Sequence, residues 1–584
     1  PSDELTQARQ YFDEAESLRL KGEFDEAIAK CNEAIRLHAH YAKAYGTRGA
    51  SYRSKGDLDR AIADLTTAIE LDPTYVWAFT QRGSVYRFKG MLDQALVDIE
   101  NALALDRAFP WAWGERGMIH RARREYDEAI SDFDRALDLN PDYDLIYLER
   151  GRTRRFLEHY DLALADFSEL LVKEKYLDAA YGERGAVHRR LGEFDKAIDD
   201  LTEALKSEPD PWTLVERAQA YAAKREYVLA LNDFTQAMEL DPKYEWAAAE
   251  RAALYRRLGR AEEAVADMTV ALTLGSTAWR HAERGAAFAA LDRYDEALVD
   301  LNAALQMQPD YAFALAQRGA VYRLTDRYNE AIADLTRAIK LGYANDWTYA
   351  QRGFAFRMKG LYDFAIDDFT VAIEKDPEYG WAFGQRGIAH RQRNDLAQAI
   401  GDLTRAHELQ VGDDWVLAQR GAAYRRQGAF AQAIADFTAA LALQQSPWVY
   451  VERGLAYRGL KQYDDALADL SRAIELSPTY DQAWGERGIT QAERGNLDDA
   501  IADFTQAITL NPQLGWALDQ RGLALRKKGD TERALADFSE SLRQYPKDGW
   551  TWAQRGVTHR VRGDYDEAIA DLTEAINLGR KEAW

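Results

Sequence analysis

An arginine followed by a small residue recurs along almost the whole chain, and its regular spacing limits the possible folds more than any other feature. The steps between successive copies are 34 residues, apart from three of 33 that end at Arg217, Arg284 and Arg453. A period of this length indicates an array of short structural repeats instead of one globular core. The arginines are Arg48, Arg82, Arg116, Arg150, Arg184, Arg217, Arg251, Arg284, Arg318, Arg352, Arg386, Arg420, Arg453, Arg487, Arg521 and Arg555.

Each repeat contains two short amphipathic segments. In the unit at 347–379 these are Trp347–Met358 and Tyr362–Lys375, and apolar residues recur at helical spacing in both. The position of Ala365 is alanine in every unit, and that of Gly353 is always glycine or alanine. Small residues at fixed places predict two helices that approach each other closely.

The two ends of the array differ from its interior. Residues 1–41 form a divergent unit with Glu14 in place of the arginine, and we expect it to act as a cap. Residues 42–584 hold sixteen units in register and the first residues of a further, truncated unit that Trp584 opens. We therefore expect the chain to have been excised from a larger multidomain protein.

The residues of one unit near the end of the chain carry a resemblance to a known family. They are similar to the tetratricopeptide repeat (TPR), and the pattern is carried by Trp552, Ala553, Gly556, His559, Ala568, Leu572 and Ala575. The resemblance implies an all-α, right-handed superhelical solenoid of about 17 helix-turn-helix repeats. First helices would line a concave groove, and long arrays of this kind are joined to other domains in bacterial proteins. One departure is systematic, because an arginine stands where the family pattern has leucine.

An aspartate accompanies this arginine in the same sixteen units. The pairing predicts a ladder of ion pairs between first and second helices, within a unit or across neighbouring units, and its members include Arg318, Asp334, Arg352, Asp368, Arg386 and Asp402. We call these residues the ladder arginines and ladder aspartates. The ladder aspartates are Asp64, Asp98, Asp132, Asp166, Asp200, Asp233, Asp267, Asp300, Asp334, Asp368, Asp402, Asp436, Asp469, Asp503, Asp537 and Asp571.

A second stripe of residues runs along the first helices. A tryptophan opens most of them, and a second arginine, the stripe arginine, follows the ladder arginine by five residues. The residue just before the ladder arginine, here called the slot, is glutamate in much of the first half and glutamine from 317 to 419. The candidate ligand-binding residues are Gln317, Arg323, Trp347, Gln351, Phe354, Arg357, Trp381, Gln385, Arg391, Trp415, Gln419 and Arg425.

The sequence leaves two roles open for the tryptophans. Each ring could face the groove, or it could pack as a wedge between adjacent repeats, which is favoured because large aromatic side chains are usually mostly buried. The amide of the slot glutamines could pair with the backbone of an extended peptide. The lysine and asparagine of chaperone-tail-binding repeats are absent, since Ala320, Phe354 and Ile388 stand in those places.

Charge is divided between the two helices of a repeat. The formal net charge is −22, yet first helices are rich in arginine and second helices in aspartate and glutamate. This division predicts a basic groove and an acidic back, which suits a partner with acidic side chains.

Enzyme chemistry finds no support in the sequence, so we expect no enzyme and no cofactor. There is no phosphate-binding G-x-x-x-x-G-K-[ST] loop, no cluster with metal-ligand spacing, and Cys31 is the single cysteine. No apolar run approaches membrane-spanning length. We expect a cytoplasmic protein that does not bind membranes.

The sequence favours a scaffold or sensor that binds a protein or peptide in its groove. Two alternatives belong to other classes. Tryptophan and arginine along one groove also suit single-stranded nucleic acid or another polyanion. The groove or an open end could instead recruit a second copy, which would make the chain a self-assembly scaffold.

Overall fold

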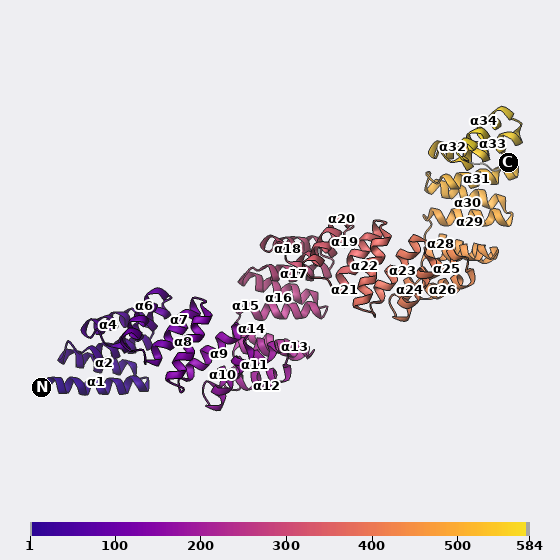
Figure 1. Cartoon of the computed structure of the whole chain (residues 1–584). Helices are drawn as coiled ribbons and strands as arrows, with labels where there is room; N and C mark the ends of the chain where they lie inside the picture. The colour runs from indigo at the N-terminus through magenta and orange to yellow at the C-terminus, as the bar shows by residue number, and fades with distance from the viewer. Residues whose placement is uncertain (1–2, 580–584) are drawn as a thin grey trace. The chain divides into compact units, whose positions relative to one another are not determined.

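The computed structural model describes residues 3–579, and these residues form 34 α-helices and no strand (Figure 1). Consecutive helices pair as helix-turn-helix repeats, so the all-α array of about 17 repeats is confirmed. The helices fall into two compact units, Pro1–Ser276 and Thr277–Trp584. The expected extra unit at Trp584 lies outside the described residues.

The first unit contains α1 to α16. Their bounds are α1 Asp3–Lys21, α2 Phe24–Leu37, α3 Ala42–Ser54, α4 Leu58–Leu71, α5 Val76–Phe88, α6 Leu92–Leu105, α7 Pro110–Ala122, α8 Tyr126–Leu139, α9 Asp144–Phe156, α10 Tyr160–Val172, α11 Leu177–Arg190, α12 Phe194–Ala204, α13 Pro211–Ala223, α14 Tyr227–Leu240, α15 Glu245–Arg257 and α16 Ala261–Leu274.

The second unit contains α17 to α34. Their bounds are α17 Ala278–Ala290, α18 Tyr294–Met307, α19 Ala312–Leu324, α20 Tyr328–Lys340, α21 Asp346–Met358, α22 Tyr362–Lys375, α23 Gly380–Arg393, α24 Leu396–Glu408, α25 Asp413–Gln427, α26 Phe430–Leu443, α27 Pro447–Gly459, α28 Tyr463–Leu476, α29 Asp481–Arg494, α30 Leu497–Leu510, α31 Gly515–Lys528, α32 Thr531–Gln544, α33 Gly549–Arg562 and α34 Tyr565–Asn577.

The helices begin and end close to where the sequence pattern places them. Helix α21 begins one residue before Trp347, because the side chain of Asn345 accepts a hydrogen bond from the Thr348 amide and caps the helix. Between α21 and α22 the chain turns at Gly360, whose φ of +74° is a left-handed conformation that glycine adopts without strain.

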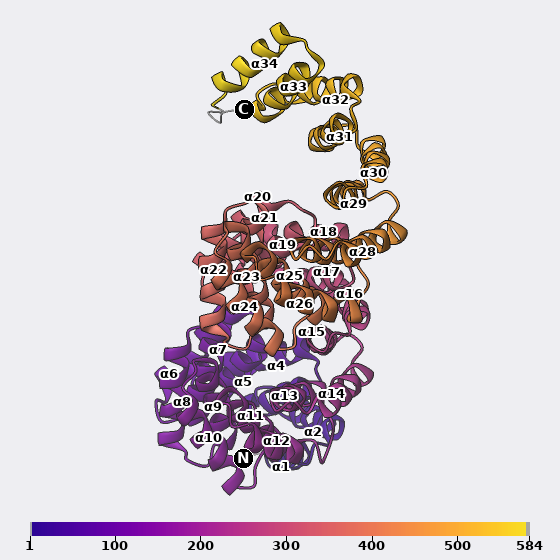
Figure 2. The ribbon, with the colours of Figure 1, turned by 90° about the vertical axis from the view of Figure 1, so that its right-hand side faces the viewer.

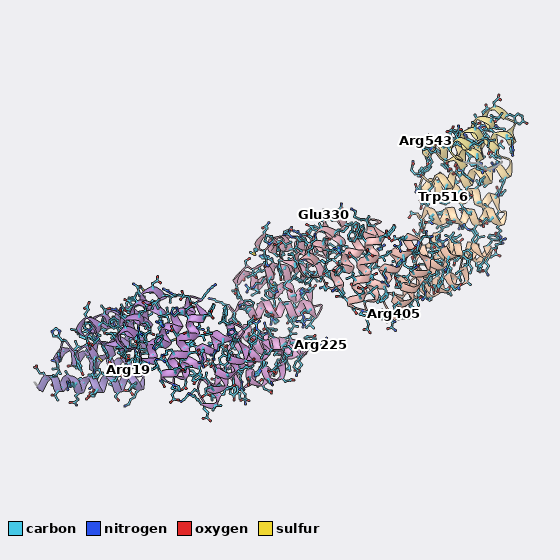
Figure 3. All side chains as sticks on the ribbon, in the orientation of Figure 1. Arg19, Arg225, Glu330, Arg405, Trp516 and Arg543 are labelled. Carbon is cyan, nitrogen blue, oxygen red and sulfur yellow. The ribbon has the colours of Figure 1, made fainter. Side chains whose placement is uncertain are left out.

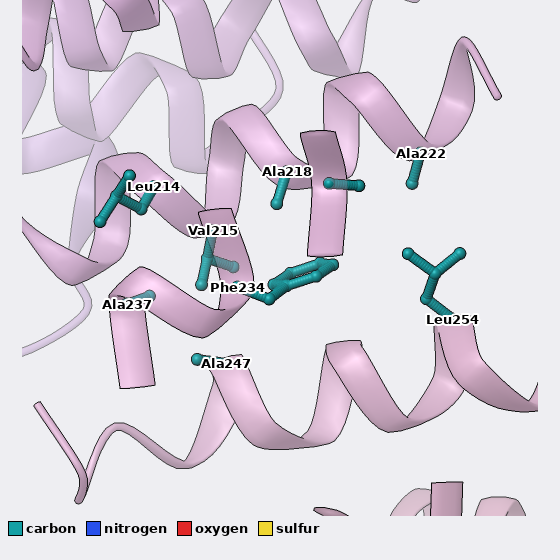
Figure 4. Close-up of a cluster of buried hydrophobic side chains, with 9 residues drawn as sticks. Leu214, Val215, Ala218, Ala222, Phe234, Ala237, Ala247 and Leu254 are labelled. Carbon is teal, nitrogen blue, oxygen red and sulfur yellow. The ribbon is translucent and has the colours of Figure 1, made fainter. Parts of the chain in front are cut away.

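Each repeat is held together by an apolar side chain packed against small residues. Phe369 of α22 is fully buried among alanines of α21, α22 and α23. A β-carbon at Gly353 would lie 3.1 Å from the Phe369 ring, so the small residue allows the close approach of the two helices. Phe234 has the same role in the first unit, where Leu214, Val215 and Leu254 surround it (Figure 4).

The ladder arginines connect three helices. Arg352 donates from Nε and Nη2 to the two carboxylate oxygens of Asp368, at 2.8 and 2.7 Å. Its remaining nitrogen, Nη1, donates to Thr336 Oγ1 of the preceding repeat at 3.1 Å. Arg318 binds Asp334 and Asn302 in the same way, and Arg386 binds Asp402 and Thr370. The contact with the preceding repeat is absent from the sequence-based prediction.

The first repeat has its own version of the ladder. Glu14 of α1 lies 2.6 Å from Lys30 of α2, so the two charges are exchanged relative to the other repeats. The sequence shows that the ladder arginine and the ladder aspartate are both missing from this repeat. In the structure an ion pair still joins the two helices, with the acidic residue on the first helix and the basic residue on the second.

First and second helices lie on different sides of each unit. Within a unit, successive first helices contact one another, as α21 contacts α23 and α23 contacts α25. Among the described residues no two successive second helices come into contact. The repeats are therefore closer together along the first helices, which makes that side the concave one. Figures 1 and 2 show the alternating helices of each unit from two directions.

Candidate functional site

Many stripe arginines are paired with a carboxylate of the next repeat. The glutamate in the slot of one repeat forms an ion pair with the stripe arginine of the repeat before it, 28 residues earlier, or 27 where the connection is one residue shorter, and Glu115, Glu216 and Glu452 also accept a hydrogen bond from that arginine. The ion pairs and their distances are Arg87–Glu115 (2.9 Å), Arg121–Glu149 (2.6 Å), Arg155–Glu183 (2.8 Å), Arg189–Glu216 (2.6 Å), Arg425–Glu452 (2.6 Å) and Arg458–Glu486 (2.8 Å).

The central repeats of the second unit lack this carboxylate. Arg323, Arg357 and Arg391 are followed in the next repeat by glutamine at the slot, and none of the three forms an ion pair with a residue that the structure describes. The Nε atom of each has no hydrogen-bond partner within the described part of the chain. Arg391 Nη2 donates to Gln419 Oε1 at 2.8 Å, a neutral acceptor that leaves the positive charge uncompensated. Three neighbouring repeats thus carry a guanidinium group that forms no ion pair with a described residue.

Glutamine fills the slot at two further places that follow a stripe arginine. Gln81 follows Arg53, and Gln554 follows Arg526 and accepts a hydrogen bond from it at 2.8 Å. Neither arginine belongs to a run of three consecutive repeats with an unpaired stripe arginine. In the repeat after Arg53, the stripe arginine Arg87 is paired with Glu115, and in the repeat before Arg526 the stripe position is Ala492. The central repeats of the second unit are therefore the longest row of this kind.

Two of the slot glutamines in this row are themselves incompletely bonded. The side chains of Gln351 and Gln385 are almost fully buried, with 6% and 4% of each residue exposed. Neither Oε1 atom has a hydrogen-bond partner among residues 3–579. Buried polar atoms without partners are uncommon and mark places where a ligand or another polar group is expected.

Burial makes the charged form of these arginines less favourable, although they remain protonated. Loss of hydration lowers the pKa of Arg323, Arg357 and Arg391, and the neighbouring guanidinium of Arg391 lowers that of Arg357 further. An anion placed beside them would restore the lost stabilisation. The arrangement therefore favours binding of a negatively charged group.

An aromatic side chain lies between two of the cations. The guanidinium carbons of Arg323 and Arg357 lie 4.9 and 4.8 Å from the ring centre of Phe354. Trp381 of the next repeat stacks on the same ring, with centres 6.0 Å apart. These cation–π contacts hold the guanidinium groups in place without neutralising them.

A cavity of about 500 Å³ opens over α21, α23 and α25. Seven candidate residues line it, and they are Phe354, Arg357, Trp381, Gln385, Arg391, Trp415 and Gln419. The sequence-based prediction missed four lining residues, Ile388, Gln392, Val411 and Gly412. The first two follow from the helical spacing of the stripe, whereas Val411 and Gly412 lie in the connection before α25.

The other five candidate residues are not among those that line this cavity. Arg425 is paired with Glu452, so the structure removes it from the set of uncompensated cations. Gln351 lies buried in α21, and Trp347 and Gln317 are half-buried on α21 and α19. Arg323 belongs to the row of unpaired arginines and contacts the cavity only through Phe354.

The tryptophans take part in both roles that the sequence left open. Trp381 stacks on Phe354 and meets Phe369 edge-on at 6.2 Å, so it packs against both helices of the preceding repeat. It also lines the cavity, as does Trp415. Trp516, labelled in Figure 3, retains 37% of its surface exposed. Packing between repeats and exposure to the groove are therefore compatible in one ring.

Family models for the tetratricopeptide repeat match residues 110–143, 148–212, 451–514 and 520–583, and a further model described as a TPR repeat matches residues 49–90. Each of these segments contains at least one ladder arginine, and they fall in both units. The chain belongs to the tetratricopeptide-repeat family. Tandem TPR arrays present extended concave surfaces and serve in general as protein-binding scaffolds.

Solved TPR structures resemble the chain at low identity. They include the APC/C hetero-tetramer Cut9–Hcn1 (16% identity, TM-score 0.36, 90% of this chain and 97% of that one) and MamA (22%, 0.26, 28% and 95%). A third is a tetratricopeptide repeat protein from Parabacteroides merdae ATCC 43184 (20%, 0.33, 42% and 98%). At such identities the likeness concerns the fold alone. No curated protein sequence matches the chain.

The part of the TPR array that the structure describes contains neither a candidate metal site nor a membrane-spanning helix. Over residues 3–579 there is no group of three or more His, Cys, Asp or Glu side chains that could hold a metal ion. None of the described helices is long and apolar enough to cross a membrane.

One repeat carries a buried carboxylate on its first helix, outside both the ladder and the slot. Asp519 of α31 stands two residues before its ladder arginine, where the other fifteen ladder repeats have glycine, alanine, threonine, valine or leucine. Burial raises the pKa of Asp519 to about 6, although the Thr551 hydroxyl donates a hydrogen bond to its carboxylate at 3.0 Å. The charged form of this carboxylate is therefore unfavourable in the folded chain.

We expect this group to make the second unit less stable as the pH rises from about 4 to about 6. Over that range the unfolded chain releases the proton of this carboxyl group while the folded chain retains it. The free energy of unfolding therefore falls as the pH rises from about 4 to about 6, and it does not fall for this reason at lower pH. Replacing Asp519 with asparagine should raise the unfolding free energy by about 2 kcal/mol at pH 7 and have little effect near pH 4. Urea unfolding followed by circular dichroism measures this. Glu493→Gln, an exposed change on α29, is the control, and an Asp519→Asn effect independent of pH would contradict the prediction.

Proposed function

We propose that the chain is a scaffold that binds a protein or peptide segment with acidic side chains in the groove over α21, α23 and α25. The observation that carries this proposal is the row of stripe arginines Arg323, Arg357 and Arg391, which have no carboxylate partner among the described residues. Burying uncompensated charge is unfavourable unless a partner of opposite charge is supplied. Such a row is therefore suited to a ligand that brings its own negative charges.

The rest of the cavity fits a polypeptide. Its volume of about 500 Å³ is typical of a site for a small ligand or a few side chains. Phe354, Trp381, Ile388 and Trp415 offer apolar surface for side chains of the bound segment. Gln385 also lines the cavity, and its buried Oε1 has no hydrogen-bond partner among the described residues.

Reversing the charge of the site tests the proposal. The double variant Arg357→Glu/Arg391→Glu should reduce the recovery of bound proteins from a lysate of the source cells by about tenfold, because each carboxylate would repel an acidic ligand. The matched control is Arg405→Glu/Arg472→Glu, which reverses two exposed arginines on the second helices α24 and α28 (Figure 3 labels Arg405). Quantitative mass spectrometry of the recovered proteins measures the difference.

Three outcomes are distinguishable. Loss with the groove variant alone supports the proposal, provided that circular dichroism shows an unchanged fold. Equal recovery with wild type and both variants contradicts it. Recovery of nucleic acid in place of protein, with binding that falls steeply as salt increases, would favour the polyanion alternative instead.

A further inference from the structure

The slot beside each ladder arginine takes two main forms in this chain, and the structure shows what each form does to the groove. Where the slot is glutamate, as in Glu149 and Glu183, a carboxylate oxygen lies 2.6 or 2.8 Å from the stripe arginine of the preceding repeat. Where it is glutamine, as in Gln351 and Gln385, the stripe arginine keeps its charge and the amide oxygen has no partner among the described residues. Glutamate and glutamine have the same size and shape, so the two forms differ in charge and not in the space they leave.

We propose that the slot determines the charge of the ligand, and that the carboxylates of the ligand neutralise the arginines that slot glutamates neutralise in the other repeats. The inference rests on the proposed function, in which a polypeptide segment lies along the groove. Gln351, Gln385 and Gln419 are then specificity-determining residues. The glutamate-bearing repeats serve as an internal example of the bound state, with a carboxylate already in contact with the guanidinium group.

The repeat structure also sets the spacing of the ligand's acidic side chains. Each unpaired arginine belongs to a different repeat, and packed helices lie about 8–10 Å apart. A polyproline II segment rises about 3.1 Å per residue, so every third side chain points the same way and recurs after about 9 Å. The ligand class that fits Arg323, Arg357 and Arg391 is therefore an extended segment with an acidic residue at about every third position.

The geometry of the existing pairs supports carboxylate recognition in particular. In Arg87–Glu115, Arg189–Glu216 and Arg425–Glu452 the stripe arginine donates from Nε to a carboxylate oxygen of the slot glutamate. The Nε atoms of Arg357 and Arg391 are buried and have no partner in the described part of the chain, so the donor that binds a slot glutamate in those repeats is left unsatisfied here. Charge-assisted bonds of this kind are stronger than bonds between neutral groups.

Fluorescence anisotropy with defined peptides tests the proposal. The probe is a fluorescein-labelled peptide of repeated Glu-Ser-Pro triplets, which favours the polyproline II conformation and places an acid at every third residue. The comparison peptides replace each glutamate with glutamine, or gather the same glutamates into one block. The wild-type chain should bind the triplet peptide about tenfold more tightly than either comparison peptide.

Matched variants separate the slot from general charge. Gln351→Glu/Gln385→Glu should weaken binding of the triplet peptide by at least about tenfold, because internal carboxylates would neutralise Arg323 and Arg357. Gln520→Glu is the control, since the same change is made where the preceding repeat has Ala492 at the stripe position, and binding should stay within about twofold of wild type. The slot variants introduce a residue that other repeats of this chain accommodate, so we expect them to fold.

The outcomes decide each part separately. If Gln351→Glu/Gln385→Glu binds the triplet peptide as tightly as wild type, or if wild type does not prefer it over the glutamine peptide, the slot does not determine ligand charge. If the block peptide binds equally well, the spacing is wrong. The proposed function is tested independently by Gln392→Trp, an exposed substitution at the cavity that changes no charge. Protein recovery that Gln392→Trp abolishes and the slot variant leaves unchanged would retain groove binding and overturn this inference alone.

Discussion

Replacing Phe369 with alanine is expected to destabilise the central repeats by about 4 kcal/mol, more than any other single substitution that we predict for this chain. The Phe369 side chain is fully buried and contacts alanines of three successive helices, so its removal leaves a cavity that the rigid helices cannot close. Because each repeat contacts only its neighbours, the loss should be local. Hydrogen exchange should show it as faster exchange of the α21, α22 and α23 amides, with little change in α29 to α34.

Phe364 supplies a control on the same helix. Its side chain is 58% exposed, and Phe364→Ala should change the stability by less than about 0.5 kcal/mol. Equal effects of the two substitutions on exchange in α21 to α23 would show that Phe369 does not hold the repeat together.

The second large effect concerns the ladder. Arg352→Ala should cost about 3 kcal/mol, because it leaves the carboxylate of Asp368 buried without its partner. Burial already raises the pKa of Asp368 despite the two hydrogen bonds from Arg352. The pair is therefore costly to bury, and its main effect is to fix how the two helices and the preceding repeat meet.

A double variant tests this interpretation. Arg352→Ala/Asp368→Leu removes both charges and should recover most of the stability lost in Arg352→Ala. Urea unfolding of wild type, both single variants and the double variant measures the coupling. A double variant that unfolds at no higher urea concentration than Arg352→Ala would show that the ladder is not a self-contained ion pair.

The fold follows from the sequence because its determinants repeat. Alanine at the position of Ala365 and glycine or alanine at that of Gly353 constrain the packing of two helices within one repeat, and seventeen near-copies of one solution leave little ambiguity. The ladder pair Arg352 and Asp368 could be predicted from co-occurrence alone. The contact of Arg352 with Thr336 could not, because it depends on how neighbouring repeats stack.

The candidate site was predicted less completely. The stripe of Phe354, Arg357 and Gln385 follows from helical spacing on the first helices. The neutralisation of Arg425 by Glu452 was missed, although the interval of 27 or 28 residues between stripe arginine and slot recurs in the sequence. That this interval joins two residues in contact becomes visible only when the directions of the side chains on two consecutive first helices are known. The boundary between the two compact units, after Ser276, lies in the shortened connection of the 33-residue step that ends at Arg284, but the same shortening before Arg217 and Arg453 is not a unit boundary, so the sequence pattern alone does not identify it.

The slot has a consequence for how such an array changes over generations. Codons for glutamate and glutamine differ at a single base, so one point mutation opens or closes an anion site in a given repeat without altering its packing. A lineage built by duplicating repeats could therefore lengthen, shorten or move its binding window along the chain while the scaffold stayed the same. In such a chain, the distribution of glutamate and glutamine over the slots of successive repeats would indicate where the ligand binds.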